Sequence, residues 1–180
     1  MNKIIVALIM IGVLTGIFAG SLPTLLPVFA ERVLSGNVET YGILLLSSGI
    51  GGMIGAMALA NFVRLRNSSS IQLIAGAGLG IGFMVLAGIE WMPVAIFIIA
   101  IIGIFSVCFG TINNTLLQSI LDDAFRGRVM SIHQIGWGAS AIGSLFVGVL
   151  AELVSVTFAF AVCGLITAVS ATPLSFSVSR

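Results

Sequence analysis

Residues 113–131 read NNTLLQSILDDAFRGRVMS and bring four charged side chains together in a chain that has few of them. These four are Asp122, Asp123, Arg126 and Arg128. One such charge at the centre of a membrane-inserted helix costs about 2.5–3.5 kcal/mol on insertion scales. The sequence on both sides of them is uncharged and apolar. We therefore predict that residues 122–129 form an aqueous loop between two membrane helices.

The composition points to a membrane protein as well. Hydrophobic residues make up 59% of the chain and charged residues 7%, whereas soluble domains carry about 25% charged residues. Uncharged runs of about 20 residues, enough for a helix to cross a bilayer core, follow one another and exclude a barrel of short alternating strands. We predict an all-α integral membrane protein in contact with the lipid bilayer. The net charge of +1 indicates no nucleic-acid partner.

Six transmembrane helices are expected, in one domain that covers residues 1–180. They span approximately residues 4–30, 41–62, 71–89, 93–121, 130–153 and 157–174. The first run could be a signal peptide, but it continues to Ala30 and is longer than the apolar core of such a peptide. Pro23 and Pro27 lack a backbone donor and are expected to kink its second half.

Small residues and the helix count suggest how these helices are arranged. Ser47, Gly51 and Gly55 repeat at every fourth position, so one side of their helix is nearly bare backbone that a neighbouring helix can approach closely. Pro93 lies near the middle of the 180 residues and separates three expected helices from three. Such a division is typical of an inverted three-plus-three repeat.

The basic residues predict the orientation in the membrane. For six helices, all but one of the seven fall on the side that holds both termini, and only Arg32 lies opposite. The positive-inside rule makes that side cytoplasmic. The residues on it are Lys3, Arg64, Arg66, Arg126, Arg128 and Arg180.

A stripe of uncharged polar residues marks the helix before the charged segment. Its members are Thr111, Asn114, Thr115 and Gln118, spaced so that they share one helix face. They could simply hydrogen-bond neighbouring helices, an interaction worth about 0.6 kcal/mol on average. Four such groups on one face exceed what helix contacts usually use, so we predict that they line a polar cavity for a substrate.

Other chemistry finds little support in the sequence. Asp122, Asp123 and His133 could be imagined as metal ligands, but the two arginines beside them favour a solvated loop, and no metal or cofactor is expected. No Ser/His/Asp set or glycine-rich phosphate loop is present, so the chain is not expected to be an enzyme. No acidic residue lies in the middle of an expected span, which leaves no evident site for proton coupling.

Two segments carry a family resemblance. Residues 114–118, NTLLQ, followed by residues 126–131, RGRVMS, resemble the loop between helices ten and eleven of major facilitator superfamily transporters, in the branch that contains the enterobactin exporter. Residues 26–30, LPVFA, and Tyr41-Gly42 resemble helices seven and eight of that branch. The chain departs from the pattern at Asp122, where a proline is common, and in lacking an Asp-Arg-x-Gly motif near Arg64 and Arg66.

The resemblance implies the carboxyl-terminal half of a twelve-helix efflux transporter in a bacterial inner (plasma) membrane. That half would export a small molecule by alternating access, paired with an amino-terminal half or with itself. Gating by the cytoplasmic loops would then fall to Asp122, Asp123, Arg126, Arg128, Arg64 and Arg66. The alternative is a non-transporting membrane subunit, such as a truncated transporter remnant.

Overall fold

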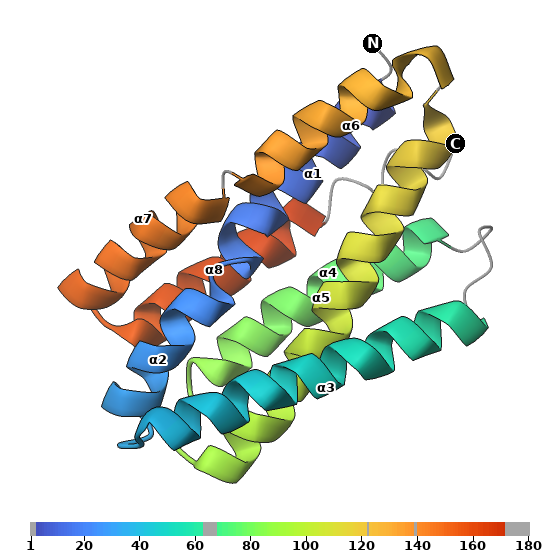
Figure 1. Cartoon of the computed structure of the whole chain (residues 1–180). Helices are drawn as coiled ribbons and strands as arrows, with labels where there is room; N and C mark the ends of the chain where they lie inside the picture. The colour runs from blue at the N-terminus through green and yellow to red at the C-terminus, as the bar shows by residue number, and fades with distance from the viewer. Residues whose placement is uncertain (1–2, 63–67, 122, 139, 172–180) are drawn as a thin grey trace.

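The structure, a computed structural model, describes residues 3–62, 68–121, 123–138 and 140–171. This part of the chain folds into α-helices without strands, which lie along a common long axis (Figure 1). The helices are α1 (Lys3–Ala19), α2 (Leu22–Arg32), α3 (Val38–Phe62), α4 (Ser68–Leu86), α5 (Met92–Ile120), α6 (Asp123–Gly138), α7 (Ser140–Leu153) and α8 (Val156–Ala171). The prediction of an all-α protein is confirmed.

Length and hydropathy identify the elements that can cross a membrane. Three helical stretches are long and apolar enough to span one, namely Ile9–Arg32, Val38–Asn61 and Met92–Ile120. Three shorter apolar helices accompany them, Ser70–Leu86, Ser140–Leu153 and Val156–Ser170. Large apolar side chains such as Met53 and Leu145 are 68% and 72% exposed on the outside of the bundle. Side chains of this kind are stable in contact with lipid, as expected for an integral membrane protein.

The expected helix over residues 4–30 is not continuous, because the structure divides it into α1 and α2, although Ile9–Arg32 as a whole is long and apolar enough for one span. α1 ends at Ala19, and the Ser21 hydroxyl turns back to donate to the Ile17 carbonyl at 2.7 Å. Pro23 then occupies the first turn of α2, where a missing backbone donor costs nothing. Pro27 is accommodated inside α2.

The expected loop is wrong for residues 123–129, which are helical, whereas residues 130–138 and 140–153 are helical as predicted. α6 already begins at Asp123, and a second helix, α7, starts at Ser140. A charged segment at the end of a membrane helix can remain helical, because its long side chains extend to the polar interface and an acidic first turn suits the helix dipole. The ranges predicted for the other four helices agree with α3, α4, α5 and α8 to within a few residues.

α3 packs closely along α5, as the small-residue stripe predicted. A Cβ atom added to Gly55 would lie 2.7 Å from the Ile104 carbonyl oxygen, closer than real Cβ atoms come to any neighbour. The same construction at Gly51 overlaps the Ala100 carbonyl, and at Gly103 it overlaps the Ser48 carbonyl. Only glycine therefore fits at these three positions without moving a helix.

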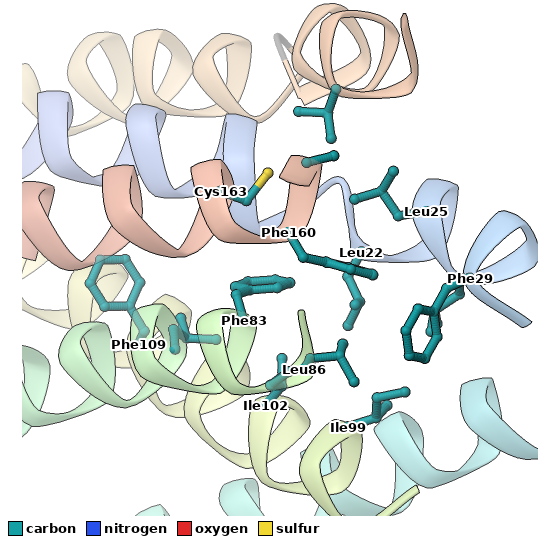
Figure 2. Packing of buried hydrophobic residues seen from close by; sticks show 14 of the residues in the cluster. Leu22, Leu25, Phe29, Phe83, Leu86, Ile99, Ile102, Phe109, Phe160 and Cys163 are labelled. Carbon is teal, nitrogen blue, oxygen red and sulfur yellow. The ribbon is translucent and has the colours of Figure 1, made fainter. Parts of the chain in front are cut away.

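The apolar core joins α2, α4, α5 and α8 (Figure 2). Phe83 of α4 stacks on Phe160 of α8 with ring centroids 6.0 Å apart, and Phe29 of α2 meets Phe160 edge-on at 5.4 Å. These rings come from the end of α4 and the start of α8, so the aromatic part of the core fills the half of the bundle near the α2–α3 turn. The opposite half contains the polar side chains described next.

Candidate functional site

A polar groove lies between α5 and α6. Its volume is about 320 Å³, near the lower end of the size of small-molecule pockets, about 300–1,000 Å³. The α5 positions in its wall repeat at every fourth residue and so share one helix face. The lining residues are Ser106, Val107, Gly110, Thr111 and Asn114 of α5 and His133 and Gln134 of α6.

Two of the four residues of the predicted polar stripe line the groove. Thr111 and Asn114 line it, whereas Thr115 and Gln118 are exposed further along the same helix. The Gln118 side-chain amide donates to Asn114 Oδ1 at 3.1 Å, and the Thr115 hydroxyl donates to the Thr111 carbonyl at 2.8 Å. Because the Asn114 oxygen accepts from Gln118, its NH₂ group supplies the donors that Asn114 can offer to a ligand.

A buried row of three polar side chains lies behind the groove wall. The Gln72 amide of α4 donates to Asn113 Oδ1 of α5 at 2.7 Å, and Asn113 Nδ2 is 3.1 Å from His133 Nε2 of α6. The three residues are at most 3% exposed. Three helices are thus joined through amide and imidazole groups in a bundle whose buried side chains are mostly apolar. His133 belongs to both this row and the groove lining.

α1 completes the surroundings of the row. A Cβ atom at Gly12 would lie 3.0 Å from His133 Nε2 and still nearer to Asn113 Nδ2, so glycine gives the row its space. A cavity of about 40 Å³ adjoins Gly12, Thr15 and Asn113, larger than the roughly 10–15 Å³ that one water needs. The buried hydroxyl of Thr15 has no hydrogen-bond partner among the described residues.

The described part of the structure includes only some of the charged residues predicted for gating. Asp122, Arg64 and Arg66 lie outside the described residues, as do the side chains of Asp123 and Arg126. Arg128 is exposed on α6. Their gating role stays a prediction.

Five residues of the groove and of the buried row were not predicted as site residues. They are Gln72, Ser106, Asn113, His133 and Gln134. Ser106 could have been found, because it extends the stripe of Gly110 and Asn114 by one more step of four. Gln72 also carried a signal as the one amide side chain within α4. His133 and Asn113 become functional candidates only when α5 and α6 are brought together.

The chain was compared with known proteins. A family model described as "Transmembrane secretion effector" matches residues 1–178. The staphyloferrin A transporter of Staphylococcus aureus (strain NCTC 8325 / PS 47) is 29% identical over 149 residues, which are 82% of this chain and 37% of that protein. The multidrug efflux pump Tap of Mycolicibacterium fortuitum is 28% identical over 112 residues, 62% of this chain and 27% of that protein.

The chain thus spans about a third of the length of the curated relatives that it matches. The match to the family model, in contrast, covers nearly all of the chain. This agrees with the resemblance in residues 114–118 and 126–131 and excludes an enzyme. The chain belongs to the transmembrane secretion effector family of major facilitator transporters.

Proposed function

We propose that this chain forms the carboxyl-terminal six-helix half of an efflux transporter that exports a small molecule by alternating access. α1 and α2 together make the first of the six spans, and α6 and α7 together make the fifth. The helices would then form the three-plus-three inverted repeat expected from the position of Pro93. The observation that supports a transport role best is the polar groove between α5 and α6.

The shape and lining of this groove suit a small amphipathic substrate. Hydroxyl, amide and imidazole groups from Thr111, Asn114 and His133 stand beside the apolar Val107 and the bare backbone of Gly110. Sites for small molecules usually combine apolar walls with a few polar groups that fix orientation. The groove forms one wall of a transport pathway, and an amino-terminal six-helix unit supplies the other.

Substitution in the groove should alter export. With Asn114→Leu, the rate of ethidium efflux from cells that produce the assembled transporter should fall about three- to tenfold, the worth of one or two lost hydrogen bonds. Asn61→Leu is the matched control, because Asn61 is exposed on α3 and its amide donates to the Met57 carbonyl of its own helix at 2.9 Å. Equal efflux by the two variants, at equal abundance, would count against the groove as the substrate site.

We propose that both termini are cytoplasmic and that the α2–α3 turn is on the outer side of the membrane. The distribution of basic residues supports this orientation. Arg32, the one basic residue on the other side, forms an ion pair with Glu152 of α7 at 2.9 Å, so its charge is locally balanced.

Cysteine labelling tests the orientation. A membrane-impermeant maleimide added outside intact cells should label Val38→Cys and should label Gly127→Cys only after the cells are opened. Val38 is 84% exposed, a Cβ atom at Gly127 meets nothing within 4 Å, and the native Cys108 and Cys163 are buried. Labelling of Gly127→Cys in intact cells would reverse the proposed orientation.

A further inference from the structure

His133, Asn113 and Gln72 have hydrogen bonds whose directions depend on one another. The Gln72 amide donates to Asn113 Oδ1, so the Asn113 side chain presents its NH₂ group to the histidine ring. An NH₂ group can only donate, so His133 Nε2 must accept and therefore carries no proton. The ring is neutral in this arrangement, and its proton is on Nδ1.

Protonation of the ring is incompatible with this arrangement. A protonated histidine has a hydrogen on both nitrogens, so Nε2 would face the Asn113 NH₂ group donor to donor. The conflict ends when the Asn113 amide turns over and accepts from Nε2. The Gln72 amide must then turn over as well, because Asn113 now presents its NH₂ group towards α4.

We propose that His133 is a proton-binding site and that Asn113 relays its protonation state to Gln72, reversing both hydrogen bonds when a proton binds. Two unpartnered atoms support this proposal. Among the described residues, Gln72 Oε1 and His133 Nδ1 are buried without a hydrogen-bond partner. Neither of the two bonds therefore has to compete with a third group when it reverses. Because the row is buried, the reversal of only one of the two hydrogen bonds would leave polar groups unsatisfied, which is costly.

The position of the row determines how a proton reaches His133 and which helix responds. His133 is one of the groove-lining residues, so a proton from the groove has only to reach the adjacent buried ring, while Gln72 lies on α4, which packs along both α5 and α8. A change at the groove wall is thus passed to α4, the helix that also carries Phe83 of the apolar core. The use of this relay to couple export to a proton gradient rests on the proposed function, whereas the relay itself does not.

Few other titratable residues lie on the described helices around the ring. Those on α6 and on the helices around it are Asp123, Arg126 and Arg128 on α6, Lys3 on α1, Cys108 on α5 and Glu152 on α7. Lys3 precedes Gly12 by nine residues, about 13 Å of helix, and the Cys108 thiol faces the Gly55 carbonyl of α3. α4 carries no titratable side chain. The pH response of the row should therefore follow His133.

The chain contains a single histidine, which makes the test direct. The chain should be purified through a histidine-free tag and labelled with ¹⁵N in its histidine and glutamine side chains, and its NMR spectrum followed from pH 8 to pH 4. We expect Nε2 to be unprotonated at pH 8, and the Gln72 amide signals to shift in the same step in which the ring gains its proton. A ring protonated on Nε2 at pH 8, a ring that stays neutral to pH 4, or a Gln72 signal that ignores the titration would each overturn the proposal.

Substitution of Asn113, the middle residue of the row, separates the relay from a direct effect of pH on Gln72. In Asn113→Leu the ring should still titrate, but the Gln72 signals should no longer follow it, whereas Asn61→Leu should behave as the unchanged chain does. If Asn113→Leu does not fold, Asn113→Asp provides the check, because a carboxylate beside the ring favours the protonated form and moves the midpoint of the titration to higher pH. An unmoved midpoint would contradict the contact. Because the spectra require no transport, a failure here is distinct from a failure of the proposed export.

Discussion

Replacing Gly51 by Leu should remove most of the folded chain from the membrane. A Cβ atom at Gly51 overlaps the backbone carbonyl of Ala100, so a side chain can enter only if α3 moves away from α5. Overpacking of a well-packed interior costs about 1–3 kcal/mol and occasionally more, even when flexible side chains can yield. Here the obstacle is backbone, so we expect about 3 kcal/mol or more, a large part of the marginal stability of a folded domain.

Gly49→Leu is the matched control for this experiment. Gly49 lies two residues earlier on α3, and a Cβ atom there meets nothing within 4 Å. Both variants carry the same loss of helix flexibility and the same added side chain. We expect the Gly49 variant to match the unchanged chain in membrane abundance and in resistance to heat-induced aggregation in detergent. Equal behaviour of the two variants would show that α3 and α5 are not held together by close backbone contact.

The fold was readable from the sequence where its signals are local. Runs of apolar residues located the helices, and the spacing of Ser47, Gly51 and Gly55 identified the closely packed side of α3. The differences at residues 20–22 and 123–129 have a different cause. A hydrophobicity pattern measures how much of a segment can enter lipid and carries no information on whether the backbone is continuous at Ser21 or helical at Asp123.

The site was readable only in part for a related reason. Thr111 and Asn114 were found because a polar stripe on one helix is visible in the chain itself. Asn113, the residue directly before Asn114, is buried in the bundle and contacts Gln72, which lies 41 positions away, and His133, which lies 20 positions away. A polar residue that is satisfied by partners on other helices looks in sequence like any isolated polar residue.

Purified on its own, the chain should associate with itself and transport nothing. Thr115 and Gln118 are exposed on the face of α5 that also carries the groove. Each side chain makes one hydrogen bond within α5. Its other donors and acceptors would face lipid if the chain were alone in the membrane. An unsatisfied polar group in hydrocarbon costs several kcal/mol, so a second polar face should cover it. In mild detergent we expect the chain to elute as a dimer or a larger species.

Two measurements test this expectation. Thr115→Val combined with Gln118→Leu removes the exposed polar groups and should shift the chain towards a monomer, whereas Asn61→Leu on α3 should leave its size unchanged. Vesicles that contain only this chain should show no gradient-driven movement of staphyloferrin A or ethidium, while vesicles with the full-length staphyloferrin A transporter serve as the positive control. Alternating access moves one six-helix half against another, and a single half provides only one wall of the pathway. Sustained flux through the lone chain, above that of empty vesicles, would show that paired copies of it form a complete transporter.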